Sequence, residues 1–413
     1  MKLFNSFRLR ILLLFGVVGP GLITAFADND AGGVATYSVA ASKYGYNIFL
    51  TLIPITIVLL ITQEIGGRIA VVTGKGLGDL IRERFGLRVS LLIFFLLLAV
   101  NFGVILQDLG GLKSALGLFH LNILVFLPVL IASLFYIVTN ASYAKIEKFF
   151  LFLVFFYAAY IVSAFLARPD WFTTVKTIVI PYQNFQPGFI YTSIAVLGTT
   201  VTAWGQFFIN SYVKDKKLTI ESLKYNQLEI YVSAFLTNIV SLFIMVAVIA
   251  TLWTHNIQIN NASEAALAIA PLAGQFASLL FGFGLLVAGF IGAAVVPLAT
   301  AYAFSEFFGY EGSLDVSFNK SRLFYGMFIL QILAGLCLTL LPNFSLFSIT
   351  IVADFLNGAF LPVVFFFLYK FANNKELMGS YRNSFMQNVL LVGAGVVITV
   401  ACIIGLVSQY IHF

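Results

Sequence analysis

Charged residues are scarce in this chain of 413 residues: Asp, Glu, Lys and Arg make up 10%, whereas hydrophobic residues make up 61%. A water-soluble protein of this length needs far more charge to cover its surface, so this scarcity excludes a soluble globular protein. It leaves one membrane domain, residues 1–413, with no separate soluble domain. The net charge of +6 does not indicate nucleic-acid binding, because the basic residues lie between apolar runs.

Cysteine and histidine are also rare. Both cysteines, Cys337 and Cys402, lie inside apolar runs, which excludes a disulfide framework or a cysteine metal site. The three histidines lie outside the apolar runs, in loops or at the chain end, so no imidazole is expected inside the membrane. The motifs H-E-x-x-H and G-x-S-x-G are absent, and we expect no enzyme activity.

Long apolar runs are abundant. A transmembrane helix needs about 20 apolar residues, and eleven segments meet this requirement. They span approximately residues 12–38, 47–72, 89–115, 121–139, 146–167, 188–212, 227–252, 275–305, 322–341, 346–370 and 384–410. The sequence therefore predicts an all-α polytopic membrane protein with eleven transmembrane helices.

The distribution of Lys and Arg predicts the orientation. If the N-terminus is cytoplasmic, only Lys43, Lys113, Arg168 and Lys176 fall outside, Arg68 lies within a span, and every other basic residue falls inside. This bias predicts a multi-pass protein of the cell membrane with a cytoplasmic N-terminus and an extracytoplasmic C-terminus.

The N-terminal region allows an alternative interpretation. Lys2, Arg8 and Arg10 precede an apolar run that ends in Ala25-Phe26-Ala27, as in a cleavable signal peptide. Gly19-Pro20-Gly21 interrupts that run, however, and favours a first transmembrane helix.

Polar residues interrupt the first predicted span at Asp28, Asn29 and Asp30, directly before Gly32 and Gly33. A carboxylate at mid-membrane depth costs roughly 2.5–3.5 kcal/mol, so such a residue usually has a function. Glycines allow the helix to unwind and turn backbone carbonyls toward an ion. This stretch predicts the first half of a cation site.

The sixth predicted span has a similar interruption, from Gly198 to Gln206, rich in Thr and Gly. Broken helices at corresponding places in two halves predict an inverted repeat of five plus five spans. The repeats would cover approximately 12–167 and 188–370, and 384–410 would be an extra helix. Alternatively, the small residues only allow close helix packing.

Several motifs resemble the Nramp family of divalent-metal transporters. Gly19-Pro20-Gly21, Asp30-Ala31-Gly32-Gly33 and Tyr44-Gly45-Tyr46 have the spacing of its first span, and further similar stretches are Val71–Lys75, Arg82–Arg84, Lys145–Glu147, Ala167–Trp171 and Asn373–Gly379. The resemblance implies a LeuT-like fold with broken helices 1 and 6 and transport of divalent metal ions.

The chain departs from the family pattern at residues that carry its chemistry. Gly33 replaces an asparagine ligand, Thr202 stands at the place of a methionine ligand, and Trp204 stands at that of a histidine linked to proton transport. Asp108 lies near one of the acidic residues of the family's third span. In these departures the chain most resembles the Nramp-related magnesium transporter branch.

The candidate ligands are oxygen donors, which suit Mg²⁺ and Mn²⁺ better than soft metals. The predicted metal ligands are Asp30, Asp28, Asn29, Thr202 and the backbone carbonyls near Gly33 and Thr199. Gln206, Asp354, Asn357 and Asp108 are candidates for supporting roles, or they only join helices by hydrogen bonds. No cofactor is expected, because the ion is the transported substrate.

Because no histidine lies in a predicted span, we expect passive, electrogenic passage of hard divalent ions rather than proton coupling. A proton cycle through Asp30 and Asp108, as in a proton-coupled Mn²⁺/Fe²⁺ symporter, is one alternative. Sodium-coupled symport of a small solute on the same fold is another, although two carboxylates beside the helix break disfavour an anionic substrate.

Overall fold

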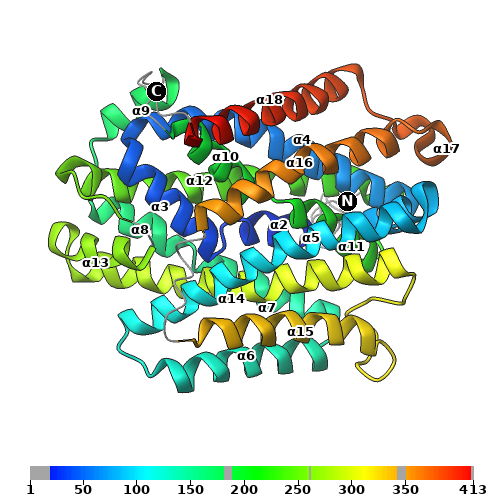
Figure 1. The fold of residues 1–413 in the computed structure, drawn as a ribbon, viewed down its shortest axis with the longest axis horizontal. Helices are drawn as coiled ribbons and strands as arrows, with labels where there is room; N and C mark the ends of the chain where they lie inside the picture. Colours follow the sequence, from blue (N-terminus) through cyan, green and yellow to red (C-terminus); the bar gives the residue numbers. More distant parts are fainter. Residues whose placement is uncertain (1–18, 181–187, 260–261, 342–349, 411–413) are drawn as a thin grey trace, which may run out of the picture.

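The fold is entirely helical over the residues that the computed structural model describes, 19–180, 188–259, 262–341 and 350–410 (Figure 1). The long helices and helix pairs are, in chain order, α2 (Pro20–Ala27) with α3 (Ala31–Tyr44), α4 (Leu52–Thr73), α5 (Leu77–Leu118), α6 (Ile123–Asn140), α7 (Tyr143–Phe155) with α8 (Ala158–Leu166), α10 (Phe189–Thr200) with α11 (Ala203–Asp215), α12 (Leu223–Thr251), α14 (Gln275–Phe308), α15 (Arg322–Thr339), α16 (Thr350–Ala372) and α18 (Phe385–Tyr410). Shorter helices are α9 (Trp171–Val179), α13 (Ala262–Ala273) and α17 (Lys375–Met378), with 3₁₀ turns at Gly45–Thr51, Ile220–Ser222, Trp253–His255 and Gly379–Tyr381.

The count of spans agrees with the predicted eleven. Ten helical stretches in the described part are long and apolar enough to cross a membrane. One of them, Ala31–Thr73, contains both α3 and α4, and the chain turns between them at Gly45, whose φ of 55° suits glycine. It therefore supplies the second half of the first span and the whole of the second.

The helix breaks in the first and sixth spans are confirmed. Asp28–Asp30 separates α2 from α3, and Val201 and Thr202 separate α10 from α11. The fifth span is also interrupted, at Phe156 and Tyr157 between α7 and α8. This third break was not predicted from the sequence, because the residues around it are uniformly apolar or aromatic.

The broken helices lie inside the bundle. In Figure 1, α18 runs along the top edge and α6 along the bottom edge, with α2, α3 and α11 between them. Large apolar side chains on these edge helices are exposed, such as Leu124 on α6 and Val397 on α18. An exposed apolar surface of this kind is expected to face lipid.

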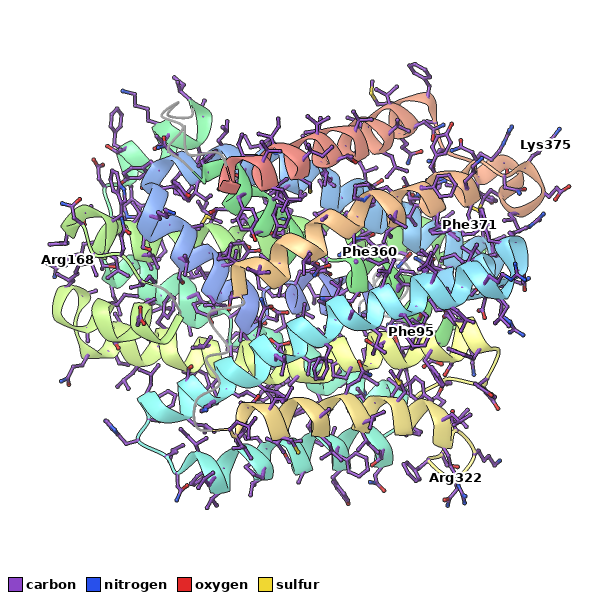
Figure 2. The ribbon with its side chains drawn as sticks, viewed as in Figure 1. Phe95, Arg168, Arg322, Phe360, Phe371 and Lys375 are labelled. Carbon is purple, nitrogen blue, oxygen red and sulfur yellow. The ribbon has the colours of Figure 1, made fainter. Side chains whose placement is uncertain are left out.

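Basic residues predicted on opposite sides of the membrane lie at opposite ends of the helix bundle. Figure 2 shows Arg168, predicted outside, at one end, and Arg322 and Lys375, predicted inside, at the other. Which end faces the cytoplasm stays a prediction, and Lys2, Arg8 and Arg10 lie outside the described residues.

Close helix packing around the breaks depends on glycine. A methyl group on Gly198 of α10 would lie 2.0 Å from the carbonyl oxygen of Asp354 and 2.5 Å from the nitrogen of Gly358, both on α16. A real side chain cannot approach so closely, so glycine allows α10 and α16 to pack backbone to backbone. This packing brings Asp354 and Asn357 next to the sixth-span break.

Candidate metal site

Asp28 joins the two helix breaks. Its backbone ends α2, and its Oδ1 accepts a hydrogen bond of 2.7 Å from Thr202 Oγ1 at the start of α11. Its Oδ2 accepts a hydrogen bond of 3.2 Å from Gln63 Nε2 of α4. Asp28 and Thr202 are 1% and 2% exposed, so this contact lies in the interior.

Asp30 begins α3. Its backbone is extended, and its Oδ1 accepts a hydrogen bond of 2.7 Å from the Gly33 nitrogen. Asp108 of α5 adds a second carboxylate at the same helix end, because its Oδ1 accepts from the Ala31 nitrogen at 3.0 Å. The free N–H groups and the dipole of a helix N-terminus favour negative charge there. Both carboxylates are buried, and Asp108 Oδ2 has no hydrogen-bond partner among the described residues.

Three oxygen atoms of predicted ligands converge beside Gly33. A methyl group on Gly33 would lie 2.9 Å from the Asp28 carbonyl oxygen, 3.1 Å from Thr199 Oγ1 and 3.5 Å from Asp30 Oδ1. These oxygens come from both broken helices. Because residue 33 has no side chain, no side-chain carbon lies among these oxygens, which are hard donors of the kind that Mg²⁺ and Ca²⁺ bind.

Asp354 and Asn357 of α16 form hydrogen bonds with both broken helices. Asp354 Oδ2 accepts a hydrogen bond from Thr36 Oγ1 of α3, and its Oδ1 accepts one of 3.2 Å from Gln107 Nε2 of α5. Asn357 Oδ1 accepts a hydrogen bond of 2.8 Å from the Ala203 nitrogen, the first residue of α11. Asn357 therefore caps the second half of the sixth span together with Thr202.

Asn29 lies in the first break, but its side chain is engaged with α12. Its Nδ2 donates to the Thr237 carbonyl oxygen at 2.9 Å, and its Oδ1 accepts from Ser241 Oγ at 2.7 Å. Its backbone carbonyl accepts from the Tyr157 hydroxyl at 3.0 Å. The structure thus brings Asp28, Asp30, Gly33, Thr199 and Thr202 together and directs the Asn29 side chain elsewhere.

Some polar residues next to the site were not predicted from the sequence. Gln63 contacts Asp28, and Gln107 Oε1 would lie 2.3 Å from a methyl group on Gly32. The signal was present in the sequence, since each is an amide within an apolar span. The second span also carries Glu64 and Arg68, which lie four residues apart on α4. That pair forms at 2.8 Å, and Gln227 and Gln387 also donate to Glu64.

The site offers a few carboxylate, hydroxyl and carbonyl oxygens in the buried interior of the protein. Asp28, Asp30, Thr199, Thr202 and Asp354 are each at most 2% exposed. In the part of the chain that the structure describes, no three His, Cys, Asp or Glu side chains are placed to hold a metal ion together. This donor set fits an ion that keeps part of its water shell, because the protein supplies only a few of the oxygens an ion needs.

Comparisons with known proteins agree with this architecture. Residues 21–408 match the family model described as natural resistance-associated macrophage protein-like, or Nramp. The divalent metal cation transporter MntH of Bacillus subtilis (strain 168) is 24% identical over 393 residues, which cover 90% of this chain and 87% of that protein.

Solved transporter structures share the fold. A mutant of the Eremococcus coleocola manganese transporter superposes with a TM-score of 0.77 at 15% identity, covering 96% of this chain and 87% of that one. Mhp1, a transporter of the nucleobase-cation-symport-1 family, gives 0.62 at 14% identity, covering 95% and 92%. The expected LeuT-like arrangement with two broken helices is therefore present in this chain.

Proposed function

This chain belongs to the Nramp family, and from that premise we propose that it transports divalent metal cations across the cell membrane. The observation that carries the proposal is the convergence of the Asp28 carbonyl, the Thr199 hydroxyl and the Asp30 carboxylate beside Gly33, where the two broken helices meet. The relatives named for divalent metal and manganese transport support the same class of substrate.

We further propose that hard ions, Mg²⁺ above all, are preferred, as in the magnesium branch of the family. The converging donors are carboxylate, hydroxyl and carbonyl oxygens, and Thr202 stands at the sixth-span break where a soft thioether would favour late transition metals. Mg²⁺ dehydrates reluctantly and is held by one or two carboxylates with waters retained. In this assignment Asp30, Asp28 and Thr199 contact the ion or its waters, and Thr202, Asp354 and Asn357 hold the ligands in place.

Transport is proposed to be passive and driven by the ion gradient and the membrane potential. Of the histidines that the structure describes, His120 lies outside the membrane-spanning stretches and His255 is the exposed last residue of one, Ile220–His255, so we expect the pathway to lack the usual proton carrier near neutral pH. The inverted repeats 12–167 and 188–370 would rock around the fixed site with the extra helix 384–410 outside them.

For the orientation in the membrane, we propose that the N-terminus is cytoplasmic and the C-terminus lies on the outer side.

Proton-coupled transport of Mn²⁺ or Fe²⁺ is the second candidate. It is favoured by Asp108, whose Oδ2 is buried without a partner in the described part of the chain while its Oδ1 bonds the same helix end as Asp30. Two carboxylates so placed are able to exchange a proton as the ion arrives.

The test of the site is divalent-ion flux into proteoliposomes with a series of Mg²⁺, Mn²⁺, Ca²⁺, Fe²⁺ and Cd²⁺. Asp30→Ala removes the carboxylate that supplies one of the three converging oxygens, so we expect flux to fall to the level of empty liposomes. Asp170→Ala, an exposed aspartate in the loop before α9, is the matched control and should transport normally. Normal flux in Asp30→Ala would remove the central residue from the proposal.

A further inference from the structure

Four buried amide side chains near the helix breaks, none of them a predicted metal ligand, carry atoms without hydrogen-bond partners among the described residues. They are Gln63, Gln206, Asn210 and Asn226. Among the described residues, both amide atoms of Gln206 and of Asn226 are unpartnered, as are Gln63 Oε1 and Asn210 Oδ1. All four side chains are fully buried. An unpaired buried amide is costly, and native proteins usually satisfy such groups with water or a ligand. These four side chains have no solvent-accessible surface in this conformation, so their unpartnered groups can bond water or a hydrated ligand only when the helices around them move apart.

The four amides belong to three helices that pack on one another. Gln63, Gly66 and Gly67 share one face of α4, at positions i, i+3 and i+4. A methyl group on Gly66 would lie 2.8 Å from Asn210 Nδ2 of α11, and one on Gly67 would lie 3.1 Å from Asn226 Oδ1 of α12. The glycines thus bring the α4 backbone close to both amides.

The row formed by these four amide side chains, called the polar file below, begins at the candidate metal site. Gln63 Nε2 donates to Asp28 Oδ2 at 3.2 Å, which ties the first amide to a proposed ligand. On α11, Asn210 Nδ2 donates to the Gln206 carbonyl oxygen at 2.8 Å, so these two residues follow each other one turn apart. The polar file therefore runs from Asp28 along α4 and α11 to Asn226, near the start of α12.

We propose that Gln63, Gln206, Asn210 and Asn226 line an inner passage in which the partly hydrated divalent cation pauses between the central site and the cytoplasm. This inference rests on the proposed function. Neutral amides suit the task, because their oxygens and N–H groups bond the waters of the ion without holding the ion as tightly as a carboxylate would. Conduction needs binding that is weak enough for the ion to leave.

The first experiment compares Asn226→Leu and Asn210→Leu with wild type in Mg²⁺ flux into proteoliposomes. Leucine keeps the size of asparagine but removes its bonds to a hydrated ion, so the maximal flux should fall at least about tenfold. Asn238→Leu is the matched control: it changes the same residue type on the same helix as Asn226, but among the described residues no buried atom of Asn238 lacks a hydrogen-bond partner. It should leave flux unchanged.

A second measurement does not depend on the transport rate of a leucine variant. Asn226→Cys is made in a background with Cys337→Ser and Cys402→Ser, the two native cysteines. A water-soluble cationic methanethiosulfonate should modify the new thiol and block flux, and Mg²⁺ should slow the modification. A dry, purely structural Asn226 predicts no modification and no protection by Mg²⁺.

The outcomes separate the two proposals. If wild type transports and Asn226→Leu and Asn210→Leu transport equally well, the inner passage is overturned while the central site stands. If wild type carries none of the divalent ions, the proposed function fails first. Reduced flux in both leucine variants with normal flux in Asn238→Leu, together with Mg²⁺ protection of Asn226→Cys, supports the passage.

Discussion

At the scale of single residues, the chemistry of the site depends on small differences in the donor set. Gly33 places no side-chain atom among the Asp28, Thr199 and Asp30 oxygens that lie around it. Thr202 contributes a hydroxyl that donates to Asp28 and at the same time accepts from the Gly205 nitrogen at 3.0 Å. The resemblance places both residues where the family has larger ligands, and we expect the smaller oxygen donors to favour a hydrated hard ion.

Gly33→Ala tests whether the ion binds against the oxygens that lie around Gly33. The added methyl group would lie 2.9 Å from the Asp28 carbonyl oxygen, and overpacking of this kind costs about 1–3 kcal/mol. We expect the apparent Mg²⁺ affinity, measured from the concentration dependence of flux, to fall by about tenfold. Gly117→Ala is the control, since nothing lies within 4 Å of a methyl group there. If both variants keep the same apparent Mg²⁺ affinity, the ion does not bind beside Gly33.

Thr202→Met tests the selectivity. A thioether at the sixth-span break adds a soft donor, so uptake should shift from Mg²⁺ toward Mn²⁺ and Cd²⁺ in a competition assay. Loss of the hydroxyl that caps α11 should also lower stability by about 1 kcal/mol. Thr202→Ser keeps the hydroxyl and should keep the wild-type preference. An unchanged preference in Thr202→Met would show that a thioether at residue 202 does not reach the ion.

At the scale of elements, the short helix α2 is held at its beginning by one side chain. Glu229 of α12 is buried and accepts hydrogen bonds from the nitrogens of Gly19, Gly21 and Leu22 at 3.1, 3.1 and 2.7 Å. The first N–H groups of a helix have no partners within it, so a carboxylate placed there satisfies three of them at once. The position of α2 therefore depends on α12.

Glu229→Gln should loosen α2. The neutral amide offers a single acceptor oxygen and no charge, and hydrogen bonds to a charged group contribute about 1.5–3 kcal/mol. Hydrogen exchange of the backbone amides in 19–27 should therefore rise by at least about tenfold, as measured by mass spectrometry. Glu221→Gln, at an exposed site before α12, should leave this exchange unchanged. Unchanged exchange in Glu229→Gln would mean that other contacts fix α2.

At the scale of the whole molecule, an eleven-span bundle with two broken helices encloses the site proposed for a divalent cation. A membrane potential acts on such an ion with roughly 2.3 kcal/mol per elementary charge per 100 mV, which is roughly 4.6 kcal/mol for a dication. Proton-coupled and passive transport differ at this scale, because only the former changes the pH of the compartment.

A negative potential inside proteoliposomes, set by valinomycin and a potassium gradient, should accelerate Mg²⁺ uptake without acidifying the lumen. A pH-sensitive dye inside the vesicles and an external Mg²⁺ indicator measure both quantities together. Asp30→Ala vesicles control for leakage. Acidification in proportion to metal flux would favour the proton-coupled alternative through Asp108.

The sequence by itself determined the number of spans and the places of the two central helix breaks. Both are read locally: a span is a continuous apolar run, and the two breaks lie where polar or hydroxyl residues next to glycines interrupt such a run at corresponding places in the two halves. The sequence also indicated the candidate residues of the site, and their role in metal binding stays a prediction.

Only the tertiary structure decided where each side chain of the breaks points. Asp28 has ψ of −18° and Asp30 has ψ of −177°, so neighbouring carboxylates leave the chain in different directions, toward Thr202 and toward Gly33. In a regular helix the spacing of residues fixes their faces, but in unwound backbone the dihedral angles do, and these follow from packing. For the same reason the turn of Asn29 toward α12 and the contacts of Gln63, Gln107 and Glu229 could not be predicted from the sequence.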